Sequence, residues 1–185
     1  MLMKNIFILL GVLTITASFT PKANVNEINT YPKPEGVDKL LFYIQRTIDA
    51  NTIVYTLNED KDGNLNEKEP IKVYWVKYAQ GGKIDPLTYI QRNYAYGVQS
   101  KMIDAEKKSF SFEFVSYHKK RFYLLKSATD KKYHVYGYIN NKLTILNNIL
   151  VKIEGGTFWV PNVKYVEVKA FDPSASAEVT EIIKP

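Results

Sequence analysis

The sequence predicts a mainly β protein: an antiparallel meander that closes into a barrel-like or sandwich fold, with one short α-helix near residues 86–96. Two observations carry this prediction. From Val98 onward, bulky and polar residues alternate with period two, the repeat of a strand that is buried on one face. The chain also contains 14 tyrosines and nine phenylalanines, and aromatic residues are enriched in strands. Because open sheet edges invite aggregation, we expect the meander to curl onto itself.

The first 23 residues have the layout of a secretory signal peptide. Lys4 provides a positive start, residues 6–15 form an uninterrupted apolar stretch, and small residues suited to cleavage follow, the last of them Ala23. The apolar run ends by Phe19, short of the ~20 residues that a membrane-spanning helix needs. We therefore expect an exported protein, periplasmic or secreted. It would carry no lipid anchor, because the chain has no cysteine.

The rest of the chain divides into a short lead-in and one domain. Residues 24–38 contain Pro32, Pro34 and Gly36 among polar residues, and we expect them to be extended. Residues 39–185 are long enough for a single β-rich domain with a hydrophobic core, and too short for two domains of ordinary size. Since no disulfide can form, this core alone must stabilise the domain.

About nine strands are predicted, most of them separated by recognisable turns. Residues 40–47 and 51–58 are joined by a short polar turn, and residues 71–78 form a third strand. Further along, alternation places three phenylalanines on one face of a strand at residues 110–117. The pair Asn140-Asn141 tolerates the positive φ of a tight hairpin, which extends the meander toward the C-terminus.

The helix near residues 86–96 is predicted from its end signals and its spacing. Asp85 can cap the first turn, and Pro86 sits where a first-turn proline is tolerated. Gly97 is expected to close the helix in a left-handed conformation. Apolar residues at helical spacing define the predicted buried face, which consists of Leu87, Ile90 and Tyr94.

Residues 58–69 match the calcium loop of an EF-hand position by position. Oxygen-bearing side chains stand at loop positions 1, 3, 5 and 9, glycine at position 6, an aliphatic residue at 8 and glutamate at 12. The spacing suits Ca²⁺, which takes ~6–8 oxygens, because the turn at the glycine folds alternate side chains inward and the glutamate can supply two oxygens. The predicted ligands are Asn58, Asp60, Asp62, Asn64 and Glu69.

Two features of the same loop count against calcium. Its flanks are predicted strands rather than the helix pair of an EF-hand, and Asn58 replaces the usual aspartate at position 1, which lowers the charge. The alternative is an Asp-Gly hairpin whose acids are solvated. An exported protein would need only the ~10⁻⁴–10⁻³ M affinity of extracellular calcium modules.

Motifs for catalysis are few, and no catalytic residue is predicted. The chain has two histidines, His118 in a predicted turn and His134 in a predicted strand. The sequence contains no nucleophile elbow, His-Glu-x-x-His motif, phosphate-binding glycine loop or dinucleotide fingerprint. A carboxylate pair for glycoside hydrolysis stays open, because such pairs are assembled from residues that are distant in sequence.

The tetrapeptide Tyr-Ile-Gln-Arg occurs twice, at residues 43–46 and 89–92. The first copy lies in a predicted strand and the second in a predicted helix, which favours a coincidence of composition over an internal duplication. Arg46 and Arg92 are candidate partners for buried carboxylates, or for anions if they line a pocket.

Four strings carry a resemblance to a known family. They are FYIQR (residues 42–46), NTIVY (51–55), DGNLNEKEPIKVYWVKY (62–78) and IQRNYAYG (90–97). Together they resemble the exported bacterial domain-of-unknown-function family numbered 4833. The resemblance implies a periplasmic or secreted domain, and it carries no assigned activity, substrate or catalytic residue.

Charge and motifs together favour a binding domain over an enzyme. The formal charge of +6 falls to +4 when residues 1–23 are removed with their two lysines and no acid. Lysine pairs at residues 107–108, 119–120 and 131–132 are expected to mark turns on alternate sides of the sheet, so no basic stripe forms and nucleic acid is not an expected partner.

The leading functional prediction is therefore a small ligand, or an envelope protein, bound at an aromatic-lined barrel mouth or on the sheet face. The sequence does not name the residues that would bind it. Two alternatives stay open: a structural envelope module stabilised by Ca²⁺ at residues 58–69, and a carbohydrate-active enzyme with a carboxylate pair.

Overall fold

The computed structural model describes residues 31–157 and 160–185. The predicted signal peptide, residues 1–23, lies outside the described residues, as does the first part of the predicted lead-in. Export and the removal of the signal peptide therefore stay predictions. No helix in the described ranges is long and apolar enough to cross a membrane.

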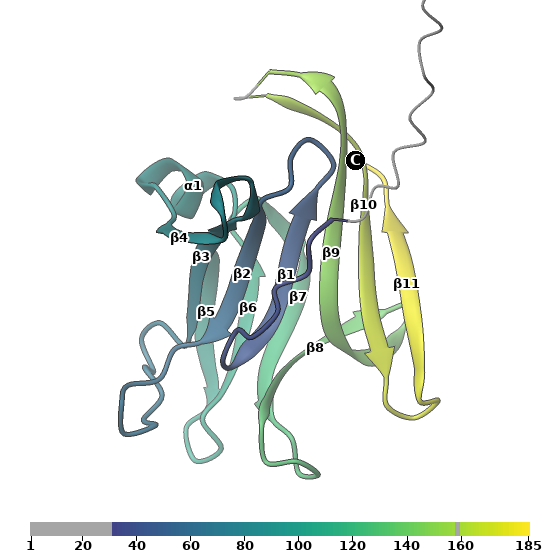
Figure 1. Ribbon diagram of the computed structural model, residues 1–185. Coiled ribbons are helices and arrows are strands. Elements are labelled where there is room, and N and C mark those ends of the chain that lie inside the picture. The colour runs from purple at the N-terminus through teal and green to yellow at the C-terminus, as the bar shows by residue number, and fades with distance from the viewer. Residues whose placement is uncertain (1–30, 158–159) are drawn as a thin grey trace, which may run out of the picture.

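Most of the described chain is strand, which confirms the mainly β fold class (Figure 1). In chain order the elements are β1 (Leu40–Arg46), β2 (Thr52–Leu57), β3 (Ile71–Lys77), the 3-10 helix η1 (Tyr78–Gln80), β4 (Lys83–Pro86), α1 (Tyr89–Tyr94), β5 (Val98–Asp104), β6 (Ser109–Phe114), β7 (Tyr117–Lys126), β8 (Tyr133–Ile139), β9 (Lys142–Gly156), β10 (Pro161–Asp172) and β11 (Ala177–Ile183).

The described strands form one curled, barrel-like sheet. Its main path runs in the order β4-β3-β2-β1-β9-β8-β7-β6-β5, and β10 and β11 continue from β9 outside this path. Consecutive strands pair in antiparallel fashion from β1 to β4 and again from β5 to β11, as the predicted meander requires. A single parallel pairing, between β1 and β9, joins these two runs.

The long strand β9 is where the sheet divides. Its residue Ile145 pairs with β8 on one edge and with β10 on the other. Farther along, residues 148–151 pair with β1 on one edge and again with β10 on the other. β8 and β1 therefore share one edge of β9, one after the other, and the sheet continues from there as two wings, β1–β4 and β5–β8.

Aromatic side chains fill the space between the two wings. Figure 1 shows β1, β2 and β3 in front of β5, β6 and β7. Phe42 of β1 stacks on Tyr55 of β2, with ring centroids 4.2 Å apart, and Phe112 of β6 stacks on Phe122 of β7 at 5.6 Å. Phe114 lies edge-on to all four of these rings. All five side chains are buried, so contacts between rings hold the wings together.

The helix is shorter than predicted and begins later. α1 is capped by Thr88, whose side chain accepts a hydrogen bond from the Gln91 N–H, while the Gln91 side chain accepts one from the Thr88 N–H. The predicted cap, Asp85, and the predicted first-turn residue, Pro86, belong instead to β4, which pairs with β3. Asp85 forms ion pairs with Lys77 and Lys83. Because Asp85 and Pro86 pair with β3, they are not available to begin the helix.

The predicted end and buried face of the helix also need correction. Gly97 does not have a positive φ; it is required because a Cβ there would lie 1.8 Å from the Arg92 carbonyl oxygen. Of the three apolar residues on the predicted face, only Leu87 is buried, while Ile90 and Tyr94 are 49% and 69% exposed. The pattern indicated a helix correctly but not which residues the sheet covers.

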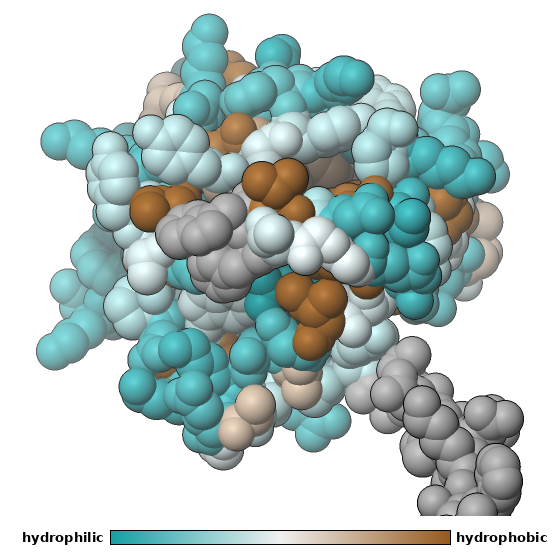
Figure 2. All heavy atoms as spheres, turned by 90° about the horizontal axis from the view of Figure 1, so that it is seen from above, coloured by the Kyte–Doolittle hydropathy of each residue, from teal (hydrophilic) through white to brown (hydrophobic). Residues whose placement is uncertain are grey.

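The end of the molecule that carries α1 exposes apolar side chains singly rather than as a continuous surface. Figure 2, the view onto this end, shows separate brown groups among hydrophilic atoms. Ile48, in the turn after β1, and Val160, just before β10, are 54% and 74% exposed. Scattered apolar residues of this kind are normal on protein surfaces and define no binding face.

A close contact between β7 and β8 provides a test of the packing between strands. Gly137 lies opposite Phe122, and a Cβ added at this glycine would lie 2.7 Å from the Phe122 Cδ1 atom. Because the Phe122 ring is held by stacking, we expect Gly137→Ala to lower the free energy of unfolding by about 1–3 kcal/mol in urea denaturation.

The double variant Gly137→Ala with Phe122→Leu is the matched control. A smaller side chain relieves the clash, so the double variant is expected to lose less stability than the sum of the two single changes. Strict additivity of the two losses would show that the contact does not limit this site.

Candidate functional site

A buried arginine cluster brings together the strings that carry the family resemblance. The guanidinium of Arg46, at the end of β1, lies 4.7 Å from the ring centroid of Trp75 in β3. Arg46 Nη1 donates to the Tyr96 hydroxyl at 2.9 Å, and Arg46 Nη2 donates to Asp49. The Arg46 side chain is only 14% exposed. A cation over an aromatic face at this depth is strongly held.

Further hydrogen bonds tie this cluster to the helix. Trp75 Nε1 donates to the side chain of Gln91 at 3.2 Å, and Gln91 also closes the capping box of α1. The Tyr55 hydroxyl donates to the Tyr96 carbonyl oxygen at 2.7 Å, and burial raises the pKa of Tyr55 well above its usual value. The cluster holds no nucleophile with an adjacent base. Its contacts anchor the chain from α1 to Tyr96 against the sheet.

The two copies of Tyr-Ile-Gln-Arg have different structures, as predicted. Residues 43–46 lie in β1 and residues 89–92 in α1. Both arginines pair with carboxylates, Arg46 with Asp49 and Arg92 with Glu69, which is 2.5 Å away. Neither carboxylate is buried, so the expected buried partners are wrong: Asp49 and Glu69 side chains are 28% and 55% exposed.

The loop at residues 58–69 is a closed turn between β2 and β3. An isolated bridge pairs Glu59 with Leu65, and Leu65 is buried in the core. Asp60 Oδ1 accepts hydrogen bonds from the N–H groups of Asp62 and Asn64, which lowers the pKa of Asp60. These contacts are those of an Asp-Gly turn anchored by an aliphatic side chain.

Of the five predicted calcium ligands, Asp60 and Glu69 have side-chain oxygens that other groups already contact. The Asn58 side-chain N–H donates to the Glu69 carbonyl oxygen at 2.7 Å, and the Glu69 carboxylate pairs with Arg92. Asn64 Nδ2 donates to Asp60 Oδ2 at 3.1 Å. In the described ranges no three acidic, histidine or cysteine side chains converge as a metal cluster. Binding of Ca²⁺ through these residues would require the Glu69 carboxylate to leave Arg92.

Calcium binding therefore stays a prediction, and it has a simple test. If the loop binds Ca²⁺ at the strength of extracellular modules, millimolar Ca²⁺ should raise the melting temperature of the protein. Asp60→Ala combined with Asp62→Ala should abolish that rise. An unchanged melting temperature in the unaltered protein would end the hypothesis.

The carboxyl groups offer little support for glycoside hydrolysis. A glycosidase needs one carboxyl with a raised pKa as general acid. In the described residues, each carboxyl with a displaced pKa has it lowered, by hydrogen bonds or by a neighbouring cation. These groups are Asp60, Asp85, Asp104, Glu113, Asp130 and Asp172.

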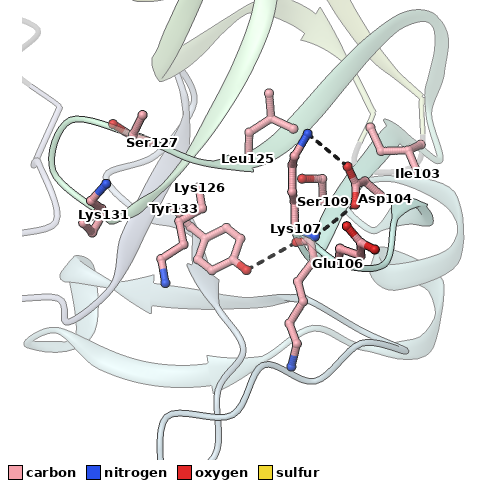
Figure 3. Close-up of a pocket in the computed structure, with 12 residues that line it drawn as sticks. Ile103, Asp104, Glu106, Lys107, Ser109, Leu125, Lys126, Ser127, Lys131 and Tyr133 are labelled. Carbon is pink, nitrogen blue, oxygen red and sulfur yellow. Dashed lines mark hydrogen bonds and ion pairs between the residues drawn. The ribbon is translucent and has the colours of Figure 1, made fainter.

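A first surface hollow, which we name the lysine hollow, lies between the β5–β6 turn and the β7–β8 turn and has a volume of about 750 Å³. Figure 3 shows Tyr133 between the two turns, with Ser127 and Lys131 on one side and Asp104 and Lys107 on the other. The hollow is lined by Ile103, Asp104, Glu106, Lys107, Lys108, Ser109, Leu125, Lys126, Ser127, Ala128, Lys131 and Tyr133. Four lysines thus face two acids across a partly apolar floor.

Hydrogen bonds fix the turns that form the lysine hollow. Asp104 accepts from the Lys107 N–H at 2.9 Å, and that bond is the main cause of the lowered pKa of Asp104. In the opposite turn, Asp130 accepts from the Lys132 N–H at 3.0 Å and contacts His134. These bonds lower the pKa of Asp130 to about 2, so the carboxylate that shapes this turn is charged at neutral pH.

A second hollow, which we name the tyrosine hollow, lies among the start of β7, the β8–β9 hairpin and the end of β11, with a volume of about 640 Å³. It is lined by Tyr117, Lys119, Lys120, Arg121, Tyr123, Tyr138, Asn140, Asn141, Glu181, Ile182, Ile183 and Lys184. Asn140 and Asn141 both have the positive φ predicted for this hairpin, and Asn140 Nδ2 donates to the Thr180 carbonyl oxygen, which holds the hairpin against β11.

Two of the three lysine pairs, at residues 107–108 and 131–132, lie in turns as predicted. The prediction was wrong for the third, because His118, Lys119 and Lys120 belong to the start of β7 and the turn before them is shorter than expected. Lys107, Lys108 and Lys131 line the lysine hollow, whereas Lys119 and Lys120 line the tyrosine hollow near the other end of β7. Successive turns of a meander lie at opposite ends of the strands, so Lys119 and Lys120 are separated from the other two pairs. The first and third lysine pairs are 24 residues apart, which is the length of two hairpins. This spacing was the signal that both pairs lie at the same end of the sheet.

Fold and site together define a β domain with a filled interior, an arginine cluster that anchors its helix, and polar hollows at the surface. Residues 42–182 match the family described as a domain of unknown function, DUF4833. The match spans most of the chain, and the protein belongs to this family. No curated protein and no solved structure was found to match it.

The two copies of Tyr-Ile-Gln-Arg provide a matched test of the arginine cluster. We expect Arg46→Lys to lower the free energy of unfolding by about 1–3 kcal/mol, because lysine cannot replace the planar contacts to Trp75, Tyr96 and Asp49. Arg92→Lys alters an exposed ion pair and should change it by less than about 1 kcal/mol. Equal losses in urea denaturation would contradict an anchoring role for Arg46.

Proposed function

We propose that this protein is an exported, non-catalytic binding domain, and that the lysine hollow takes an anionic small molecule or the anionic end of a larger ligand. The observation that carries the proposal is the excess of lysines over acids in a hollow that also has an apolar floor. Binding sites commonly combine apolar walls with a few polar groups that orient the ligand.

The lysines of this hollow differ in whether a carboxylate already neutralises them. Lys107 lies 3.4 Å from Asp104, and Lys108 lies 3.3 Å from Glu67. Within the described chain, Lys126 and Lys131 have no such ion pair. These two amines are therefore the groups that would gain most from an anionic ligand, since binding would not break an existing pair.

The walls of the hollow favour a ligand with a ring or another flat apolar face. The Tyr133 ring lies between the two turns (Figure 3), its hydroxyl donates to the Lys108 carbonyl oxygen at 3.3 Å, and burial raises its pKa. The Lys126 Nζ atom lies over one face of this ring, 6.0 Å from the ring centroid, so a ligand that contacts the ring lies beside this amine. Leu125 and Ile103 add apolar side chains to the lining. A carboxylated or phosphorylated sugar has both the charge and the flat face.

Titration with galacturonate and with inorganic phosphate tests this proposal. We expect weak binding by calorimetry, and we expect Lys126→Gln with Lys131→Gln to weaken it by about 2- to 10-fold, the effect of losing two exposed charge pairs. The control, Lys72→Gln with Lys164→Gln, makes the same change in net charge at exposed sites on β3 and β10.

Two results would contradict the proposal. One is that neither galacturonate nor inorganic phosphate binds to the unaltered protein. The other is an equal loss in both double variants, which would show that overall charge rather than the lysine hollow attracts the anion.

A further inference from the structure

The two hollows are parts of one continuous surface. Leu125 of β7 lines the lysine hollow, and Tyr123, two residues earlier, lines the tyrosine hollow. Residues two apart on a strand point to the same face and are about 7 Å apart. Phe122 and Leu124, which alternate with them, are buried in the core, so Tyr123 and Leu125 both face outward. The hollows therefore meet on the outer face of β7.

The neighbouring strand extends this surface with aromatic side chains. Val135 and Ile139 of β8 are buried, so Tyr136 and Tyr138 lie on the opposite, outer face. Tyr136 is the cross-strand partner of Tyr123. Tyr138 lines the tyrosine hollow and is 56% exposed. Tyrosines on two adjacent strands thus occupy the stretch between the lysines at either end.

Cations that lack a carboxylate partner lie at the two ends of this surface. In the tyrosine hollow, Lys120 pairs with Glu181, and Arg121 pairs with Glu113 at 2.6 Å. Within the described residues, Lys119 and Lys184 of that hollow form no ion pair, and Lys131 is the corresponding lysine of the other hollow. Lys126 alternates with Leu125, so its side chain lies on the inner face of β7, over its cross-strand partner Tyr133. From Tyr117 to Lys126, β7 spans about 30 Å.

We infer that the outer face of the β7–β8 hairpin is one track for an extended acidic polysaccharide, with a hollow at each end. The inference rests on the proposed function and adds the polymeric class of the ligand. Sugar rings would lie against Tyr123, Tyr136 and Tyr138, whose broad faces are apolar and whose hydroxyls can hydrogen-bond. Carboxylates of the polymer would lie near the lysines at the two ends.

The charge distribution favours an acidic polysaccharide over nucleic acid. A nucleic acid strand carries a phosphate at every nucleotide, so a single strand along this track would need cations throughout its length. Between the two ends, however, the track presents tyrosines, and its one arginine there is paired with Glu113. Sparse charges separated by ring faces match a polysaccharide in which a sugar that bears a carboxylate alternates with a neutral sugar.

A length series of oligosaccharides in which glucuronate alternates with a neutral sugar tests the track directly. Because a chain that engages both hollows makes the second contact intramolecular, we expect the dodecasaccharide to bind at least about tenfold more tightly than the disaccharide by calorimetry. Changing Lys119→Gln with Tyr138→Ala should reduce that gain to less than about threefold. The control, Lys72→Gln with Tyr94→Ala, removes one exposed lysine and one exposed tyrosine elsewhere and should keep the gain.

The outcomes separate the track from the proposed function. If the galacturonate affinity depends on Lys126 and Lys131 but the dodecasaccharide shows no gain, or keeps its gain in the tyrosine-hollow variant, the track is wrong and the single site stands. If galacturonate binding does not depend on those lysines, the proposed function itself fails. Tighter binding of oligothymidylate than of an alternating oligosaccharide of equal charge would overturn the choice of polymer. Unchanged melting temperatures would show that the variants are folded.

Discussion

The structure depends on the strand β9, which pairs with three other strands at once. Its residues 148–151 lie beside β1 in parallel, about a hundred residues away in sequence. Thr47, directly after β1, extends the join: its hydroxyl accepts a hydrogen bond from the Ile153 N–H at 2.9 Å and donates to the Ile153 carbonyl oxygen at 3.1 Å. Without this join, the wings β1–β4 and β5–β8 would have no shared strand to bring their aromatic faces together.

The packing that results decides where a ligand can bind. Rings from both wings occupy the space that an open barrel would offer, with Tyr55 and Phe112 almost entirely buried. The hollows form instead where turns and strand ends leave room, and their cations come from the lysines that keep those turns solvated. The lysines that keep sheet edges and turns soluble therefore also supply the charge for the binding function proposed above.

Local patterns in the sequence predicted much of the fold. Period-two alternation predicted the later strands, and Asn140-Asn141 predicted a hairpin with positive φ, because both signals depend only on neighbouring residues. The parallel pairing of β1 with β9 could not be predicted, since the alternation of a strand does not name a partner so distant in sequence. The predicted start of the helix was wrong because Asp85, a good cap in isolation, lies in β4, where Lys77 of β3 holds its carboxylate.

The candidate site was less predictable than the fold. The sequence indicated Arg46 as the partner of a carboxylate but not its place over Trp75, which requires the end of β1 and the middle of β3 to meet. The hollows join residues from separate turns, so their lining depends on strand lengths and on the sharp turns between strands. Only the spacing of the lysine pairs hinted that two turns share one end.

Hydrogen exchange of the backbone amides tests most directly whether the join between β1 and β9 holds the two wings together. If it does, amides of residues 43–46 and 148–151 should exchange only through global unfolding, with an opening free energy equal to that from urea denaturation. Opening of this pairing at a clearly lower free energy, while amides of β6 and β7 stay protected, would show that the wing β5–β8 is stable without the join and would contradict the account.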